Sequence, residues 1–187
     1  NDTLELLARK KLLPKSKDEL EEPFTIQEIQ EVMEKLALGK SAGPNRVPNA
    51  VFRYLSKHFA PKFKAMIEEA IRRGNLPKSM MEGEISVLYK KNDRDDVRNY
   101  RPITLLNSDY KIYTKILAQR MKKYVHEFVS NTQKGFVPKE IIHDCTMLLN
   151  LIEAYINDEP ETREGLFLFF DMEKAFDRVS FEFLNKA

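Results

Sequence analysis

The sequence is poor in the residues that build disulfide and zinc scaffolds. Its 187 residues include one cysteine, three histidines and no tryptophan. A single thiol, Cys145, cannot form an internal disulfide, which fits a reducing, intracellular compartment. One cysteine and three scattered histidines also cannot build a zinc site. We therefore expect a domain that folds on its hydrophobic core alone, which a chain of this length can bury.

Long hydrophobic runs are also missing. The longest apolar run covers only residues 166–170, whereas a bilayer-spanning helix needs roughly 20 apolar residues. With 42% hydrophobic and 32% charged residues, the composition excludes a generic disordered tail. We expect no membrane partner. The chain begins without Met and ends inside an expected helix, so we expect a piece of a longer protein.

Neither sign of charge dominates, because 31 basic and 29 acidic residues give a net charge of +2. An argument for a nucleic-acid partner must therefore rest on local clustering. One cluster lies in the segment 111–125, which contains no acid. It could follow a nucleic-acid backbone or could be a solvated helix face. Its basic members are Lys111, Lys115, Arg120, Lys122 and Lys123.

Apolar periodicity predicts a helix-rich α+β chain. An N-terminal apolar stripe ends at Pro14. A capping box, Thr25 to Glu28, opens a helix that Gly39 closes. Further helices are predicted over 49–57, 61–73, 108–125 and 141–156, with another from Ser180. Alternation predicts a strand over 85–89, and the apolar run 166–170 suits a central strand covered on both faces.

Two segments carry candidate chemistry. Asp171 directly follows the strand expected at 166–170, where a carboxylate suits Mg²⁺, although it could equally cap the next helix. Lys90, Lys91 and Arg101 flank a charged turn. A cationic hairpin there could close over a triphosphate, or its charges could pair internally with acids of the turn. Those acids are Asp93, Asp95 and Asp96.

Taken together, the motifs resemble the reverse transcriptases of non-LTR (LINE-type) retrotransposons. The resemblance runs from about Pro23 to Leu184. One difference is Asn45-Arg46, where the family usually has Asp-Gly. The matching blocks, in family order, are Gly39-Lys40-Ser41-Ala42-Gly43-Pro44, Leu76-Pro77 with 85–90, Asn99-Tyr100-Arg101-Pro102-Ile103 with Leu105-Leu106-Asn107, Gln133-Lys134-Gly135-Phe136 and 170–179.

The resemblance implies a role for each matching residue. Asp171 would be the first catalytic aspartate and a metal ligand, with the Met172 carbonyl beside it. Phe176 would be the aromatic gate under the incoming sugar. Lys90 or Lys91, with Arg101, would hold the triphosphate, and the spacing does not say which lysine. Nucleic acid would contact Lys111, Lys115, Lys122 and Gln133.

The same resemblance implies the architecture and partners. Residues 1–22 would be a helical extension, 23–164 the fingers, and 165–187 the start of the palm of a right-hand polymerase. The intact enzyme would copy RNA into DNA with two Mg²⁺ ions, or Mn²⁺, using an RNA template, a DNA primer and dNTP, in the nucleus. This piece alone would be inactive. A truncated palm could pair into a homodimer. The alternatives are a non-catalytic nucleic-acid-binding module and a plain interaction domain.

Overall fold

The computed structural model describes residues 12–130, 132–158, 166–172, 175 and 178–186. The chain divides into two compact units, one formed by residues 18–122 and the other by the residues before 18 and after 122. The apolar stripe expected at the N-terminus lies mostly outside the described residues, as does Phe176. No helix in the described part of the chain is both long and apolar enough to cross a bilayer.

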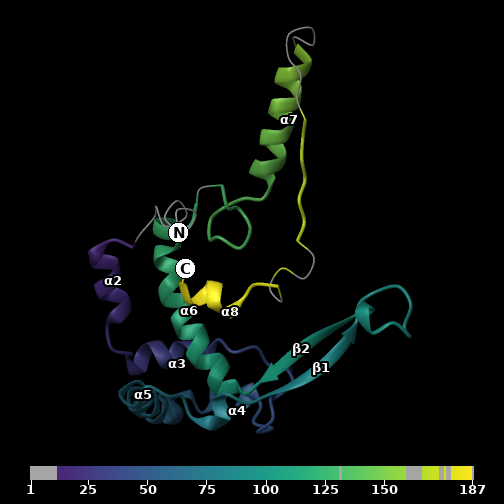
Figure 1. The fold of residues 1–187 in the computed structure, drawn as a ribbon. Helices are drawn as coiled ribbons and strands as arrows, with labels where there is room; N and C mark the ends of the chain where they lie inside the picture. Colours follow the sequence, from purple (N-terminus) through teal and green to yellow (C-terminus); the bar gives the residue numbers. More distant parts are fainter. Residues whose placement is uncertain (1–11, 131, 159–165, 173–174, 176–177, 187) are drawn as a thin grey trace. The chain divides into compact units, whose positions relative to one another are not determined.

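The core of the 18–122 unit is built by three helices (Figure 1). Helix α3 (Ile26–Glu34) begins as predicted, because the Thr25 Oγ1 accepts a hydrogen bond from the Glu28 N–H at 3.1 Å. Helix α5 (Ser56–Arg73) and helix α6 (Ser108–Phe128) supply the facing side chains. Burial of each large side chain stabilises the fold by about 1.5–3 kcal/mol. The fully buried apolar residues are Ile29, Val32, Met33, Ala60, Ile67, Met80, Ile112 and Ile116.

Several helix boundaries differ from the prediction. Pro14 does not end a helix but begins α2 (Pro14–Glu21), where the missing N–H of proline costs no helical hydrogen bond. Helix α3 ends at Glu34 with Lys35 as its C-cap, so Gly39 lies in a later turn. Helix α4 (Asn49–Tyr54) is shorter than predicted, and α5 already contains Pro61. Gly74 does end α5, with a φ of 70°.

The sheet of the 18–122 unit is a two-stranded antiparallel hairpin. Strand β1 (Gly83–Tyr89) confirms the predicted strand and pairs with β2 (Tyr100–Leu106). Short 3-10 turns, η1 (Lys78–Met80) and η2 (Val97–Asn99), precede the two strands. Every residue of β1 is exposed, so the ribbon stands out from the helices (Figure 1).

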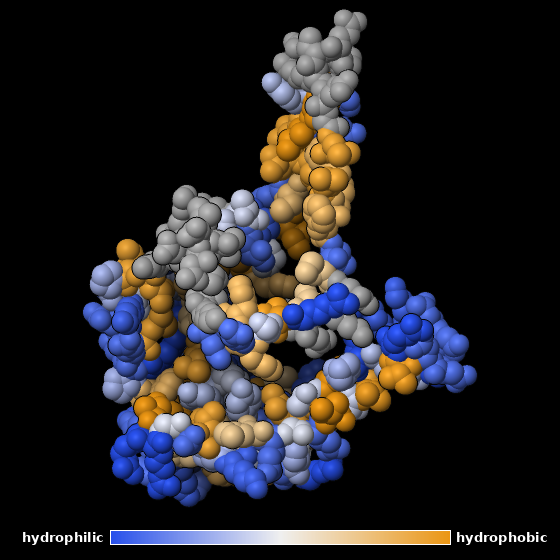
Figure 2. All heavy atoms as spheres, in the orientation of Figure 1, coloured by the Kyte–Doolittle hydropathy of each residue, from blue (hydrophilic) through white to orange (hydrophobic). Residues whose placement is uncertain are grey.

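The other unit contains α7 (His143–Asp158) and α8 (Phe181–Lys186), close to the predicted positions. The Ser180 Oγ accepts a hydrogen bond from the Phe183 N–H and caps α8. Hydrophobic side chains gather on the visible face of α7 (Figure 2), and no residue of α7 is buried. The exposed apolar residues of α7 include Met147, Leu148, Leu151 and Tyr155.

The strand predicted over residues 166–170 is wrong for this structure. The segment has no regular structure, and its apolar side chains are exposed, Phe170 by 87%. An apolar strand needs neighbours to pair its N–H and C=O groups and to cover both faces. Among the described residues the one sheet is the β1–β2 hairpin, whose strands pair only with each other, so this segment has no partner strand.

Candidate functional site

Three cations of the β1–β2 hairpin have no counter-ion among the residues that the structure describes. Lys90, Lys91 and Arg101 are exposed, and none of them forms an ion pair with a described residue. The ladder continues past β1, because the Lys90 N–H donates to the Asn99 carbonyl at 2.9 Å. The exposed hairpin therefore has cationic groups that are available to a ligand.

The strand register decides which cations share a face. Leu88 lies opposite Arg101, and Tyr89 lies opposite Tyr100. Because side chains alternate between the faces of a strand, Lys90 falls on the face of Leu88 and is a diagonal neighbour of Arg101. Lys91 follows in a bend after the last ladder bond. The structure thus groups Lys90, rather than Lys91, with Arg101.

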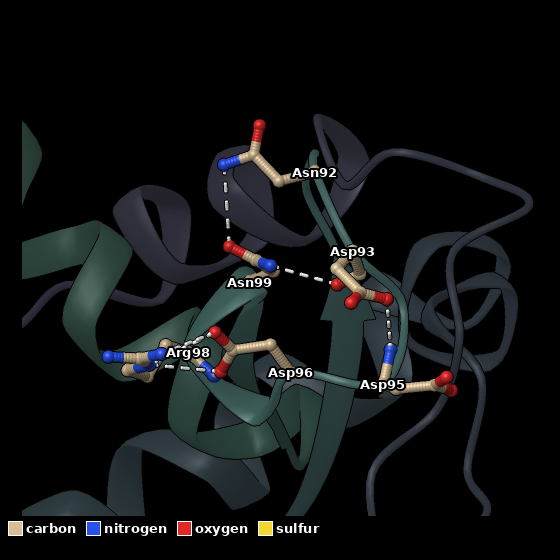
Figure 3. A network of polar contacts seen from close by, with 6 residues as sticks. All are labelled: Asn92, Asp93, Asp95, Asp96, Arg98 and Asn99. Carbon is tan, nitrogen blue, oxygen red and sulfur yellow. Dashed lines mark hydrogen bonds and ion pairs between the residues drawn. The ribbon is translucent and has the colours of Figure 1, made fainter.

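The acids of the turn are held within the tip itself (Figure 3). The Asp96 carboxylate accepts from the Arg98 backbone N–H at 2.9 Å and pairs with its guanidinium at 2.8 Å. The hydrogen bond from Arg98 lowers the pKa of Asp96 below its usual value. The Asp93 carboxylate accepts a hydrogen bond from the Asp95 N–H at 3.0 Å, and the Asp93 carbonyl accepts one from the Asn99 Nδ2 at 2.8 Å. Internal pairing is therefore confirmed for Asp96, and it does not involve the three exposed cations.

Two tyrosines stiffen the same tip. The Tyr89 hydroxyl donates to the Asn92 carbonyl at 2.5 Å, and the Tyr100 hydroxyl donates to the Arg94 carbonyl at 2.9 Å. The two rings meet edge to face with centroids 5.7 Å apart, and the Arg94 guanidinium lies 4.8 Å from the centre of the Tyr89 ring. Arg94 and Arg98 thus serve the turn, whereas Lys90, Lys91 and Arg101 pair with no acid in the described part of the chain.

The base of the hairpin is fixed by Asn107, which is 1% exposed. Its Oδ1 accepts from the Asn45 N–H at 3.1 Å, and its Nδ2 donates to the Ser79 carbonyl at 2.5 Å. A single amide therefore joins three segments that are distant in sequence. A buried amide is stable only when its donors and acceptors are satisfied, so this junction specifies one arrangement of the segments.

Ser108, at the start of α6, continues this buried junction. Its Oγ is hydrogen-bonded to the Val47 carbonyl at 3.0 Å and to the Asn49 Oδ1 at 2.8 Å. The Asn49 Nδ2 donates in turn to the Ala37 carbonyl at 2.9 Å. The 37–49 segment is thereby attached to the end of the hairpin and the beginning of α6.

Gly43 packs directly against the same junction. A Cβ added there would lie 2.4 Å from the Asn107 Oδ1 and 2.5 Å from the Asn107 backbone nitrogen. In the turn that follows, the Arg46 N–H donates a hydrogen bond to the Gly43 carbonyl. Arg46 has a φ of 57°. Sequence reasoning noticed these two blocks separately but missed their contact. The signal that could have found it is the Asn107-Ser108 pair, which stands between β2 and α6.

Arg120 is not part of an exposed basic face. Its guanidinium pairs with both carboxylate oxygens of Glu28 at 2.7 Å and donates to the carbonyls of Leu20, Glu22 and Pro23. It also lies 4.4 Å from the centre of the Phe24 ring. The hydrogen bond to Glu28 and the negative charges of Glu28 and Glu22 raise the pKa of Arg120. Arg120 therefore holds the 20–24 segment on α6, a role that charge counting could not distinguish from ligand binding.

The other members of the basic cluster differ in their surroundings. Lys115 Nζ donates to the carbonyl of Lys35, the C-cap of α3, at 3.1 Å, where a cation suits the helix C-terminus. Lys122 is exposed and Lys111 is half-buried. In the other unit, the Gln133 side chain is exposed and donates to the Gly135 carbonyl at 3.1 Å.

Asp171 and Met172 are both exposed and lie outside regular structure. Asp171 and the Met172 carbonyl offer the oxygen ligands that a hard cation prefers. The described residues contain no group of three or more His, Cys, Asp or Glu side chains that could hold a metal ion. Asp171 therefore has suitable chemistry but does not form a complete metal site with its described neighbours.

The structure thus has an exposed cationic hairpin on a helical core and, further along the chain, an exposed aspartate directly after an apolar segment. The sequence profile of the reverse transcriptase (RNA-dependent DNA polymerase) family matches residues 89–187, from the end of β1 onward. The match covers more than half of the chain, so the protein belongs to this family.

Curated relatives agree with this assignment. A transposon TX1 protein of 149 kDa from Xenopus laevis is 33% identical over 171 residues, which is 90% of this chain and 13% of that protein. The probable RNA-directed DNA polymerase from transposon BS of Drosophila melanogaster is 30% identical, over 84% of this chain and 17% of the relative. The RNA-directed DNA polymerase from the mobile element jockey of the same fly is 29% identical, over 86% and 19%.

These relatives confirm the resemblance to LINE-type reverse transcriptases. The chain spans less than a fifth of the length of each of them.

Proposed function

We propose that the chain forms the fingers and the beginning of the palm of an RNA-directed DNA polymerase, which copies RNA into DNA during retrotransposition. The observation that carries this proposal is the family match over residues 89–187. The substrates would be an RNA template, a DNA primer and dNTP, and the site of action the nucleus. The mixed helical fold with one small exposed hairpin is compatible with a fingers region.

The hairpin is the proposed triphosphate-binding element. Arg101 offers a planar pair of donors that suits a phosphate, and Lys90 adds a point charge on the same face. The braced tip keeps Arg94 and Arg98 engaged elsewhere. Lys91 lies beyond the ladder and is expected to contribute less.

Asp171 is proposed as one carboxylate ligand of the catalytic metal ions, Mg²⁺ or Mn²⁺, with the Met172 carbonyl beside it. Bound metal ions would stabilise charge on the attacking and leaving oxygens. The remaining ligands must come from residues other than the described ones. Phe176, also outside the described residues, stays proposed as the aromatic gate under the sugar.

Nucleic acid is proposed to contact the exposed cations of α6 and the loop that follows it. Lys122 and the half-buried Lys111 carry this role in preference to Lys115, whose ammonium already binds the Lys35 carbonyl. Gln133 would contribute once its side chain releases the Gly135 carbonyl.

A homodimer through the exposed 166–170 segment also stays a proposal, which light scattering on the purified chain would test.

Binding of a fluorescent dATP analogue by the 187-residue chain tests the triphosphate site. Lys90→Ala and Arg101→Ala should each weaken binding about tenfold, as expected for a charge-assisted contact. Lys91→Ala is the matched control and should change binding less than threefold. Equal losses in all three variants, or equal affinity for the monophosphate, would contradict the proposed site.

The second candidate is a non-catalytic nucleic-acid-binding module. It is favoured by the position of Asp171, which lies in an exposed segment without a described acidic neighbour. Primer extension by a longer protein that contains this chain separates the two candidates. Asp171→Asn should abolish extension in a polymerase and leave RNA binding unchanged. If the unchanged protein binds RNA but never extends a primer, the module is the better assignment.

A further inference from the structure

The loop between α6 and α7 holds two bulky residues in a backbone conformation that favours glycine. Phe136 has a φ of 62° and Lys139 a φ of 67°. For a residue with a Cβ, this conformation costs roughly 1–2 kcal/mol. Such strain persists only where the surrounding structure enforces it, and it concentrates at functional sites. The loop is therefore a place to look for a ligand.

A network within the loop enforces this conformation. The Lys134 ammonium pairs with the Glu140 carboxylate at 2.5 Å and lies 3.8 Å from the Asp144 carboxylate in the first turn of α7. The Glu140 N–H donates to the Val137 carbonyl at 3.3 Å. The hydrogen bond from the Lys134 ammonium to the Glu140 carboxylate raises the pKa of Lys134 and lowers that of Glu140. The loop is thus tied to the helix that follows it.

The consequence is that an aromatic ring is held in solvent. Phe136 is 108% exposed, more than any other apolar residue described. Lys139 is exposed as well and forms no ion pair with a described residue. Lys134, in contrast, is already neutralised by two carboxylates. An exposed ring and an unpaired cation three residues apart suit a ligand that has both a flat face and a negative charge.

We propose that Phe136 and Lys139 form a contact site for single-stranded nucleic acid, in which an unpaired base stacks on the Phe136 ring and a neighbouring phosphate pairs with Lys139. Stacking on an aromatic residue tolerates any base, and the free cation supplies the backbone contact. The inference deepens the proposed function, on which it rests, because a reverse transcriptase must hold an unpaired template strand.

The absence of tryptophan from the chain makes the stacking directly measurable. Phe136→Trp introduces the only indole, whose fluorescence a stacked base should quench. The matched control is Phe181→Trp, at another exposed phenylalanine of the same unit. An oligouridine of about ten nucleotides should quench the fluorescence at position 136 at least twice as strongly as at 181. An abasic strand of equal length should quench neither.

Affinity for the same oligouridine, followed by anisotropy of a label on the RNA, provides the second readout. Phe136→Ala should weaken binding at least fivefold, in line with the loss of one stacked base. Lys139→Ala should weaken it about threefold and reduce its salt dependence, whereas Phe181→Ala should leave it unchanged.

Binding that survives Phe136→Ala and leaves the indole at position 136 unquenched would overturn this inference but not the proposed function. If the unchanged chain binds no RNA at low salt, both proposals fail.

Discussion

The two ends of the β1–β2 hairpin are built in opposite ways. At the base, Asn107 and Ser108 are buried and their polar atoms are satisfied by distant segments. At the tip, the Asp96–Arg98 pair and its neighbours are local and solvent-exposed. Buried polar networks carry a large penalty when broken, while exposed pairs contribute little. The base therefore fixes the direction of the ribbon, and the tip only shapes the turn.

Removing the amide at the base should produce the largest effect. Asn107→Ala leaves the Asn45 N–H and the Ser79 carbonyl without their partner, and each unpaired group costs roughly 1–3 kcal/mol. We expect a loss of about 2–4 kcal/mol in the free energy of unfolding, measured by urea denaturation. Asn92→Gly, which removes a 3.5 Å contact at the tip and leaves a residue that tolerates the φ of 70° there, should cost less than about 0.5 kcal/mol. Similar losses at both positions would remove the distinction between the two ends.

Close packing at the base can be tested separately from its hydrogen bonds. In Gly43→Ala, the new methyl group would meet the Oδ1 and backbone nitrogen of Asn107 and the carbonyl carbon of Leu106 within 2.6 Å, which should cost about 1–3 kcal/mol. Gly39→Ala is the control, since a Cβ there meets nothing within 4 Å and only the φ of 69° opposes it. That strain alone costs about 1–2 kcal/mol. Denaturation of both variants should rank Gly43→Ala as the more harmful, and the reverse order would disprove the close contact.

The smallest effect is expected at the tip, where acid should loosen the turn. The pKa of Asp96 is lowered in the folded protein by its hydrogen bonds to Arg98. A lowered pKa means that the pair stabilises the turn above the ordinary aspartate pKa and loses this effect as the pH falls through the lowered value. Carboxyl-carbon NMR should show a midpoint for Asp96 below the reference of 3.8. Arg98→Ala should return it toward that reference. A midpoint that Arg98→Ala leaves unchanged would show that the pair is not formed in solution.

Local sequence signals predicted the elements that depend on neighbouring residues. The Thr25 cap, the end of the helix predicted over 61–73 and the strand predicted over 85–89 are confirmed, because each depends on signals within a few residues. The same reasoning misplaced the helix boundaries expected at Pro14 and Gly39. Proline and glycine mark a break in regular structure but do not indicate on which side of the break a helix lies. It also left Arg46 unexplained, where the family usually has glycine and where the structure has a φ of 57°.

The candidate site was foreseen in part. Charge along the sequence identified Lys90, Lys91 and Arg101, but the strand register was needed to group Lys90 with Arg101. Charge also suggested Arg120 for ligand binding, whereas the structure commits it to Glu28 and three carbonyls. The apolar run before Asp171 predicted a strand, but the structure has no strand over residues 166–170. A strand forms only where partner strands pair with its N–H and C=O groups.

The chain alone was enough to predict its helix-rich composition, the first strand of the hairpin and membership of the reverse transcriptase family, because local propensity and motif order are properties of the sequence. Packing in three dimensions set which polar residues hold the fold and which stay available to a ligand. Hydrogen bonds such as those of Asn107 and Arg120 join segments tens of residues apart. Burial, which sets their strength, exists only once those segments have packed.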